Sequence, residues 1–141
     1  MVQNMPKSNY FVEKHEIASL GASLRRIEQN ILKQSQKGDT SRVWFQGEEP
    51  YFDIFFELKN DEIAWFQFTL RGRSLSWDSK TPGWQTGTTN ELKMDDVSFY
   101  AASKTIENDT KIDSEFINLV QSILETRAEE TIFAKALALF N

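Results

Sequence analysis

The chain has 141 residues, a formal net charge of −5 and no cysteine. This length predicts one domain with its own core, over residues 9–141, and the lack of cysteine excludes disulfides and zinc–thiolate sites. The acidic balance disfavours general nucleic-acid binding, which needs a basic face. No apolar run approaches the roughly 18 residues that cross a bilayer, so we expect no membrane association and a cytoplasmic protein.

The N-terminal part begins with a polar stretch, residues 1–8, which predicts a flexible arm. A helical pattern follows from about Asn9, where aliphatic residues recur at spacings of three and four and so share one stripe. The helix is predicted to end near Lys37, because Gly38 suits a C-cap. The stripe consists of Ile17, Leu20, Leu24, Ile27 and Ile31.

Aromatic residues dominate the middle of the chain, and all four tryptophans lie between Trp44 and Trp84. Apolar and polar residues alternate there between polar turns, which is typical of antiparallel strands. We predict a meander of four or five strands, with the first helix covering one face. The strands are expected at residues 42–46, 51–58, 63–70, 74–77 and 84–88. In this core, Leu20, Leu24 and Ile27 are expected to pack on Phe52, Ile54, Phe56, Phe66 and Phe68.

The C-terminal part predicts two or three further helices, and therefore an α+β fold. Residues 97–106 fit a strand or a helix, and their spacing slightly favours a helix. Asp113 or Ser114 is the expected N-cap of a helix over residues 116–124. The polar residues 125–131 indicate either a kink or a separation from a last apolar stripe at residues 132–140.

Motifs for catalysis or metal binding are not found in the sequence. His15 is the only histidine, so a multi-histidine metal site is excluded, and we predict that it lies on the surface. No phosphate loop or nucleophile elbow is present. We therefore expect no metal and no cofactor, and the sequence gives no positive case for an enzyme.

The best candidate site is the region of Arg71, Arg73, Trp77 and Trp84. Arginine and tryptophan are enriched where binding energy concentrates, and a guanidinium group pairs well with an anion. Gly72 is expected to kink the strand between the two arginines. The alternative interpretation is structural.

In the structural interpretation, the tryptophans form a cross-strand pair beside the turn at residues 78–83. The arginines then pair within the protein, with Asp53, Glu57 or Asp78 as the expected partners.

The order of elements, a helix, an antiparallel meander and then helices, resembles that of secretion-chaperone-type and immunity-type adaptors. This resemblance implies a non-catalytic, cytoplasmic protein-binding module. We expect a homodimer, because the second sheet face carries Phe55 and Trp65. The alternative is a domain that binds a small anionic ligand in a pocket between sheet and helix, and an enzyme of unknown class is the third hypothesis.

Overall fold

The computed structural model describes residues 12–27, 40–81, 83–89 and 106–140. Its helices are α1 (Lys14–Ser23), α2 (Ser114–Glu125) and α3 (Thr131–Ala138). Its strands are β1 (Arg25–Ile27), β2 (Thr40–Gln46), β3 (Asp53–Lys59), β4 (Glu62–Leu70), β5 (Arg73–Asp78), β6 (Trp84–Thr89) and β7 (Ile106–Asn108). The predicted arm at residues 1–8 lies outside the described residues.

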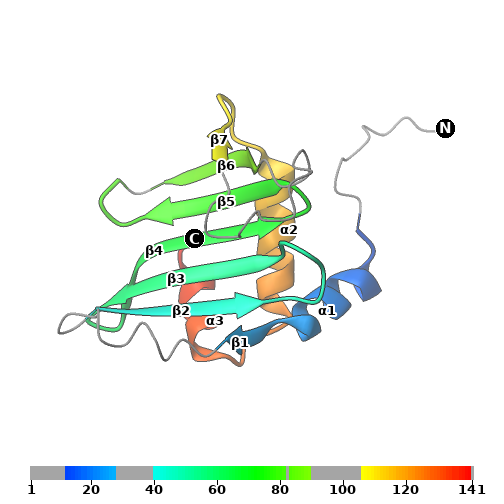
Figure 1. Cartoon of the computed structure of the whole chain (residues 1–141), viewed down its shortest axis with the longest axis horizontal. Helices are drawn as coiled ribbons and strands as arrows, with labels where there is room; N and C mark the ends of the chain where they lie inside the picture. The colour runs from blue at the N-terminus through cyan, green and yellow to red at the C-terminus, as the bar shows by residue number, and fades with distance from the viewer. Residues whose placement is uncertain (1–11, 28–39, 82, 90–105, 141) are drawn as a thin grey trace, which may run out of the picture.

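The strands form one antiparallel sheet in chain order, from β1 at one edge to β7 at the other. Helices α2 and α3 lie across one face of this sheet, behind it in Figure 1. The α+β class and the meander are therefore confirmed, but in the part of the chain that the structure describes the sheet has seven strands and not four or five. The two additional strands are the short edge strands β1 and β7, which the sequence pattern did not indicate.

The first helix is shorter than predicted. It ends at Ser23, Leu24 is extended (φ −70°, ψ 129°), and β1 then pairs with β2. The stripe up to Ile31 continues the helical spacing, but tertiary contacts override it. Arg127 donates hydrogen bonds from Nη1 to the carbonyl oxygens of Gly21 and Leu24, at 2.7 and 2.8 Å, and so caps the helix at this point. The predicted C-cap, Gly38, lies outside the described residues.

The core lies between the sheet and the C-terminal helices. Phe56 and Phe66 stack across β3 and β4, with ring centroids 5.2 Å apart. Phe133 of α3 and Phe116 of α2 pack on this aromatic layer and are almost completely buried. The sheet face predicted to be apolar is thus the core face.

The predicted role of the first helix needs correction. Leu20 and Leu24 are buried in the core as expected, but α1 packs chiefly against α2. Ile27 belongs to β1, where it pairs with Trp44, so it lies on the sheet face away from α2 and α3. The aromatic layer is covered mainly by α2 and α3, which the sequence pattern assigned to no partner.

Two tight hairpins connect the central strands. Asn60 and Asp61 join β3 to β4 as predicted, and both have positive φ, at 52° and 69°. Arg71 and Gly72 join β4 to β5 with φ of 52° and 83°. Positive φ at both central residues is typical of two-residue hairpin turns. The expected kink at Gly72 is therefore wrong, because this glycine reverses the chain between two strands.

The C-terminal helices follow the sequence pattern closely. Asp113 is the N-cap of α2, since its Oδ1 accepts a hydrogen bond from the backbone N–H of Phe116 at 3.1 Å. Turns at residues 126–130 separate α2 from α3. Ile106 lies in strand β7, and residues 97–105, for which a helix was slightly favoured, fall outside the described residues. Within the described ranges, no helix combines the length and apolar character needed to cross a membrane.

Candidate functional site

The two tryptophans of the predicted site lie on the core face of the sheet. Trp77 and Trp84 are directly opposite each other in β5 and β6, so the cross-strand pair is confirmed. Trp84 packs on Phe140, with ring centroids 4.4 Å apart, and meets Phe66 edge to face at 6.0 Å. These contacts give the tryptophans a packing role at the end of the core.

Arg71 lies at the tip of the β4–β5 hairpin and pairs with two carboxylates. Its Nε and Nη2 donate to the two oxygens of Glu49, at 3.0 and 2.6 Å, and Nη2 also lies 2.9 Å from Glu16 Oε2. The hydrogen bond from Arg71 lowers the pKa of Glu49. The same bond raises the pKa of Arg71. The arginine thus joins α1, the β2–β3 connection and the β4–β5 hairpin.

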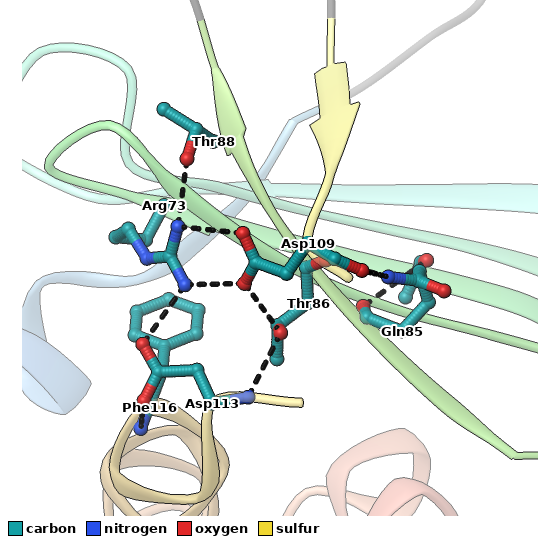
Figure 2. Close-up of polar contacts among 8 residues, drawn as sticks. Arg73, Gln85, Thr86, Thr88, Asp109, Asp113 and Phe116 are labelled. Carbon is teal, nitrogen blue, oxygen red and sulfur yellow. Dashed lines mark hydrogen bonds and ion pairs between the residues drawn. The ribbon is translucent and has the colours of Figure 1, made fainter. Parts of the chain in front are cut away.

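Arg73 is the centre of a second, less exposed network, which Figure 2 shows. Its Nη2 lies 2.6 Å from Asp109 Oδ2 and 2.8 Å from Asp113 Oδ2. Its Nη1 donates to Thr88 Oγ1 at 2.7 Å and to Asp109 Oδ1 at 3.3 Å. The side chains of Arg73 and both aspartates are only 17–20% exposed.

Residues of β6 complete this network. Thr86 Oγ1 donates to Asp109 Oδ2 at 2.7 Å and accepts from the backbone N–H of Asp113 at 3.0 Å. Gln85 Nε2 donates to the carbonyl oxygen of Asp109 at 3.1 Å. The hydrogen bond from Arg73 is the main cause of the lowered pKa of Asp109; burial opposes it, and the bond from Thr86 reinforces it. The network fastens the segment after β7 and the start of α2 to the sheet.

The candidate residues therefore separate into two groups. Trp77 and Trp84 are on the core face, while Arg71 and Arg73 each meet two carboxylates within the protein. These carboxylates belong to Glu16, Glu49, Asp109 and Asp113, which sequence reasoning did not assign to the arginines. No signal in the sequence could have found them, because each pair joins elements distant along the chain.

The opposite side of the sheet, called here the outer face, carries a second aromatic group. Trp44 and Phe55 are opposite each other in β2 and β3, and their rings stack at 5.4 Å with an interplanar angle of 13°. Trp44 Nε1 also donates to Asp53 Oδ1 at 3.2 Å, which fixes the indole. Trp65 lies on the same face in β4, and all three aromatic side chains are partly exposed.

The described residues also include groups that can titrate or bind a metal, among them His15. No group of three or more histidine and carboxylate residues there is arranged to hold a metal ion. His15 lies on the surface as predicted, with its side chain 81% exposed and Nδ1 3.4 Å from Glu13 Oε1.

Comparisons with protein-family models, curated proteins and solved structures found no match to this chain.

Proposed function

We propose that the protein is a non-catalytic, cytoplasmic protein-binding module of the adaptor or secretion-chaperone kind, and that it binds through the outer face of its sheet. The observation that carries this proposal is the rigid aromatic pair of Trp44 and Phe55, which stays partly exposed. Aromatic residues are enriched among those that dominate binding energy at protein interfaces.

The pair is already ordered before any partner arrives. The stacking on Phe55 and the hydrogen bond to Asp53 hold the indole of Trp44 in one orientation. Binding through ordered side chains loses little conformational entropy, so more of the contact energy appears as affinity. The helices cover the other side of the sheet, and a partner on the outer face needs no rearrangement of the core.

The alternative function, binding of a small anionic ligand, has less support. Arg71 and Arg73 are the natural cations for an anion, but each already pairs with two carboxylates. An anionic ligand at either position has to displace a carboxylate or share the guanidinium with it. Recognition through Arg71, Arg73, Trp77 and Trp84 is therefore the second candidate, and Arg71, with its side chain 42% exposed, is its most accessible arginine.

Photo-cross-linking in cells tests the proposal. A photoreactive phenylalanine analogue at position 55 is expected to give covalent adducts with protein. The matched control is the same analogue at Ile112, an apolar residue that is 42% exposed in the segment before α2. Adducts at position 55 and none at position 112 support the proposal. Absence of adducts at position 55, or equal adducts at both positions, contradicts it.

A further inference from the structure

Two rows of side chains cross four adjacent strands, β2 to β5, on the outer face, and the second of them continues to Ile27 on β1 and Gln85 on β6. The charged row contains Arg42, Glu57, Trp65 and Asp78, and the aromatic row contains Trp44, Phe55, Gln67 and Ser76. Next to the aromatic row, Asp53, Thr69 and Ser74 are at most 2% exposed. A partner on this face therefore meets the charged and aromatic rows first.

The two ends of these rows differ in both charge and size. At the β2 end stand a cation and the largest side chain, Arg42 and Trp44. At the β5 end stand an anion and a small side chain, Asp78 and Ser76. The face is therefore complementary to itself when one copy is reversed across the strands, because the large cationic end of each copy then meets the small anionic end of the other.

Arg42 is available for such a contact. Its side chain is 65% exposed, and its Nε lies 3.9 Å from Glu57 Oε2, at the limit of an ion pair. An exposed pair of this length contributes little to folding. The charge of Arg42 can therefore serve an interface without loss to the fold.

We propose that the occupant of the outer face is a second copy of this chain, related by a two-fold axis that runs along the strands between β3 and β4. This inference rests on the proposed function and specifies its partner. The axis leaves each residue in its own row and exchanges β2 with β5 and β3 with β4. Arg42 of each copy then faces Asp78 of the other, and Trp44 faces Ser76. In such an isologous interface each contact occurs twice, so the ion pair between Arg42 and Asp78 forms at two places.

A two-fold axis across the strands gives a poorer match. It exchanges the two rows and places Arg42 opposite Trp44, and Asp78 opposite Ser76. The opposite charges then remain on different sides of the interface.

Two charge-reversed variants, measured alone and as a mixture by analytical ultracentrifugation, test this arrangement. Wild-type protein is expected to sediment as a dimer. Arg42→Asp alone places two aspartate pairs in the interface, and Asp78→Arg alone places two arginine pairs there, so each variant should be monomeric. An equimolar mixture should form a dimer again, because each interface then contains two opposite-charge pairs. Lys111→Asp changes an exposed charge away from the face and should remain dimeric.

Other outcomes overturn the proposal. Wild-type protein that sediments as a monomer, or a mixture that stays monomeric when both variants are folded, excludes this interface. Asp78 Oδ1 also accepts a hydrogen bond from Lys80 N–H, so Asp78→Arg can disturb the turn. A second experiment avoids that residue.

The second experiment uses the lack of native cysteines. In the double variant Trp44→Cys and Ser76→Cys, the two cysteines of one chain are three strands apart. Three strand spacings of about 4.8 Å exceed the reach of a disulfide. Facing sheets pack about 10 Å apart, which leaves facing sulfur atoms several ångströms from each other, so a short thiol-to-thiol cross-linker should join two chains of the double variant. The single variants should not be joined. A double variant that stays unlinked overturns the proposal.

The two proposals can fail separately. In the cross-linking experiment at position 55, a product of two identical chains agrees with the second copy as partner. A product with a different protein overturns self-association and leaves the binding function of the outer face supported. The absence of any product counts against both.

Discussion

Arg73 and Asp109 are joined by the shortest contact of the Arg73 network, with Nη2 2.6 Å from Oδ2 across 36 positions of the chain. Arg73 lies on β5 and Asp109 follows β7, so the pair connects the central sheet to its edge. Asp113, the N-cap of α2, shares the same Nη2. One guanidinium group therefore holds an edge strand and a helix start together.

Arg73→Gln should destabilise the protein far more than Arg71→Gln. Removal of Arg73 leaves two mostly buried carboxylates beside each other, and we expect a loss of about 2–4 kcal/mol in the free energy of unfolding. Arg71 is 42% exposed, and solvent screens its pairs, so we expect a loss of about 1 kcal/mol or less. Urea unfolding of both variants measures the difference. Equal losses would show that the Arg73 network is not a structural clamp.

The double variant of both arginines separates recognition from folding. If Arg71 and Arg73 recognise an anionic partner, their replacement by glutamine removes binding at nearly unchanged stability. We expect instead that the double variant loses about as much stability as Arg73→Gln alone. Partner retention and unfolding, measured on the same preparation, decide between the two.

The Arg73 network should also give an acid-sensitive contribution to stability. The pKa of Asp109 is lowered in the folded protein by the hydrogen bond from Arg73. The resulting stabilisation is present above the unfolded pKa, about 3.9, and is lost as the pH falls through the folded pKa. Wild-type protein should therefore lose stability below about pH 4, and Asp109→Asn should lose less over the same range. Identical pH profiles in urea unfolding would contradict this contribution.

Gly21 should be intolerant of any side chain, because α1 and the end of α2 are very close there. A Cβ atom on Gly21 would lie 1.8 Å from Thr126 Oγ1 and 3.2 Å from the carbonyl oxygen of Ile123. Gly21→Ala is expected to cost about 1–3 kcal/mol through overpacking. Thr126→Ala in the same chain removes the closest atom and should recover part of the loss. A double-mutant cycle by thermal unfolding checks this, and strictly additive effects would contradict the contact.

Phe66 and Phe55 lie on opposite faces of the sheet, so their replacement by alanine should lower the free energy of unfolding by different amounts. Phe66 is completely buried, and Phe66→Ala should cost about 3–5 kcal/mol. Phe55 is partly exposed on the outer face, and Phe55→Ala should cost about 1 kcal/mol, mainly from the lost stacking on Trp44. Chemical unfolding of the two variants at low concentration gives the comparison. A larger loss for Phe55 would place the core on the other face.

The sequence predicted the central strands and both C-terminal helices because their signals are local. Alternation around Phe56 and Phe66 identified the core face, and the capping chemistry of Asp113 identified the start of α2. The end of α1 was missed because its cause is not local. The aliphatic spacing continues beyond Leu24, and only the hydrogen bonds from Arg127 fix the helix end.

The candidate site was harder to predict for the same reason. The cluster of arginines and tryptophans is visible in the sequence, but strand alternation alone did not reveal which carboxylates reach the arginines. Asp109 and Asp113 come to Arg73 only when β7 joins the sheet edge. Trp44 was visible as part of the aromatic region, but its stacking on Phe55 depends on the register between β2 and β3.

Sedimentation equilibrium of the wild-type protein and of Phe55→Gln over a range of concentrations tests whether the outer face is a protein interface. The mass of the wild-type protein is expected to rise with concentration to that of two chains. Phe55→Gln is expected to stay monomeric, and its free energy of unfolding at low concentration should fall by only about 1 kcal/mol. A wild-type protein that remains monomeric throughout, or a variant that associates as strongly as the wild type, would show that the outer face is not the interface.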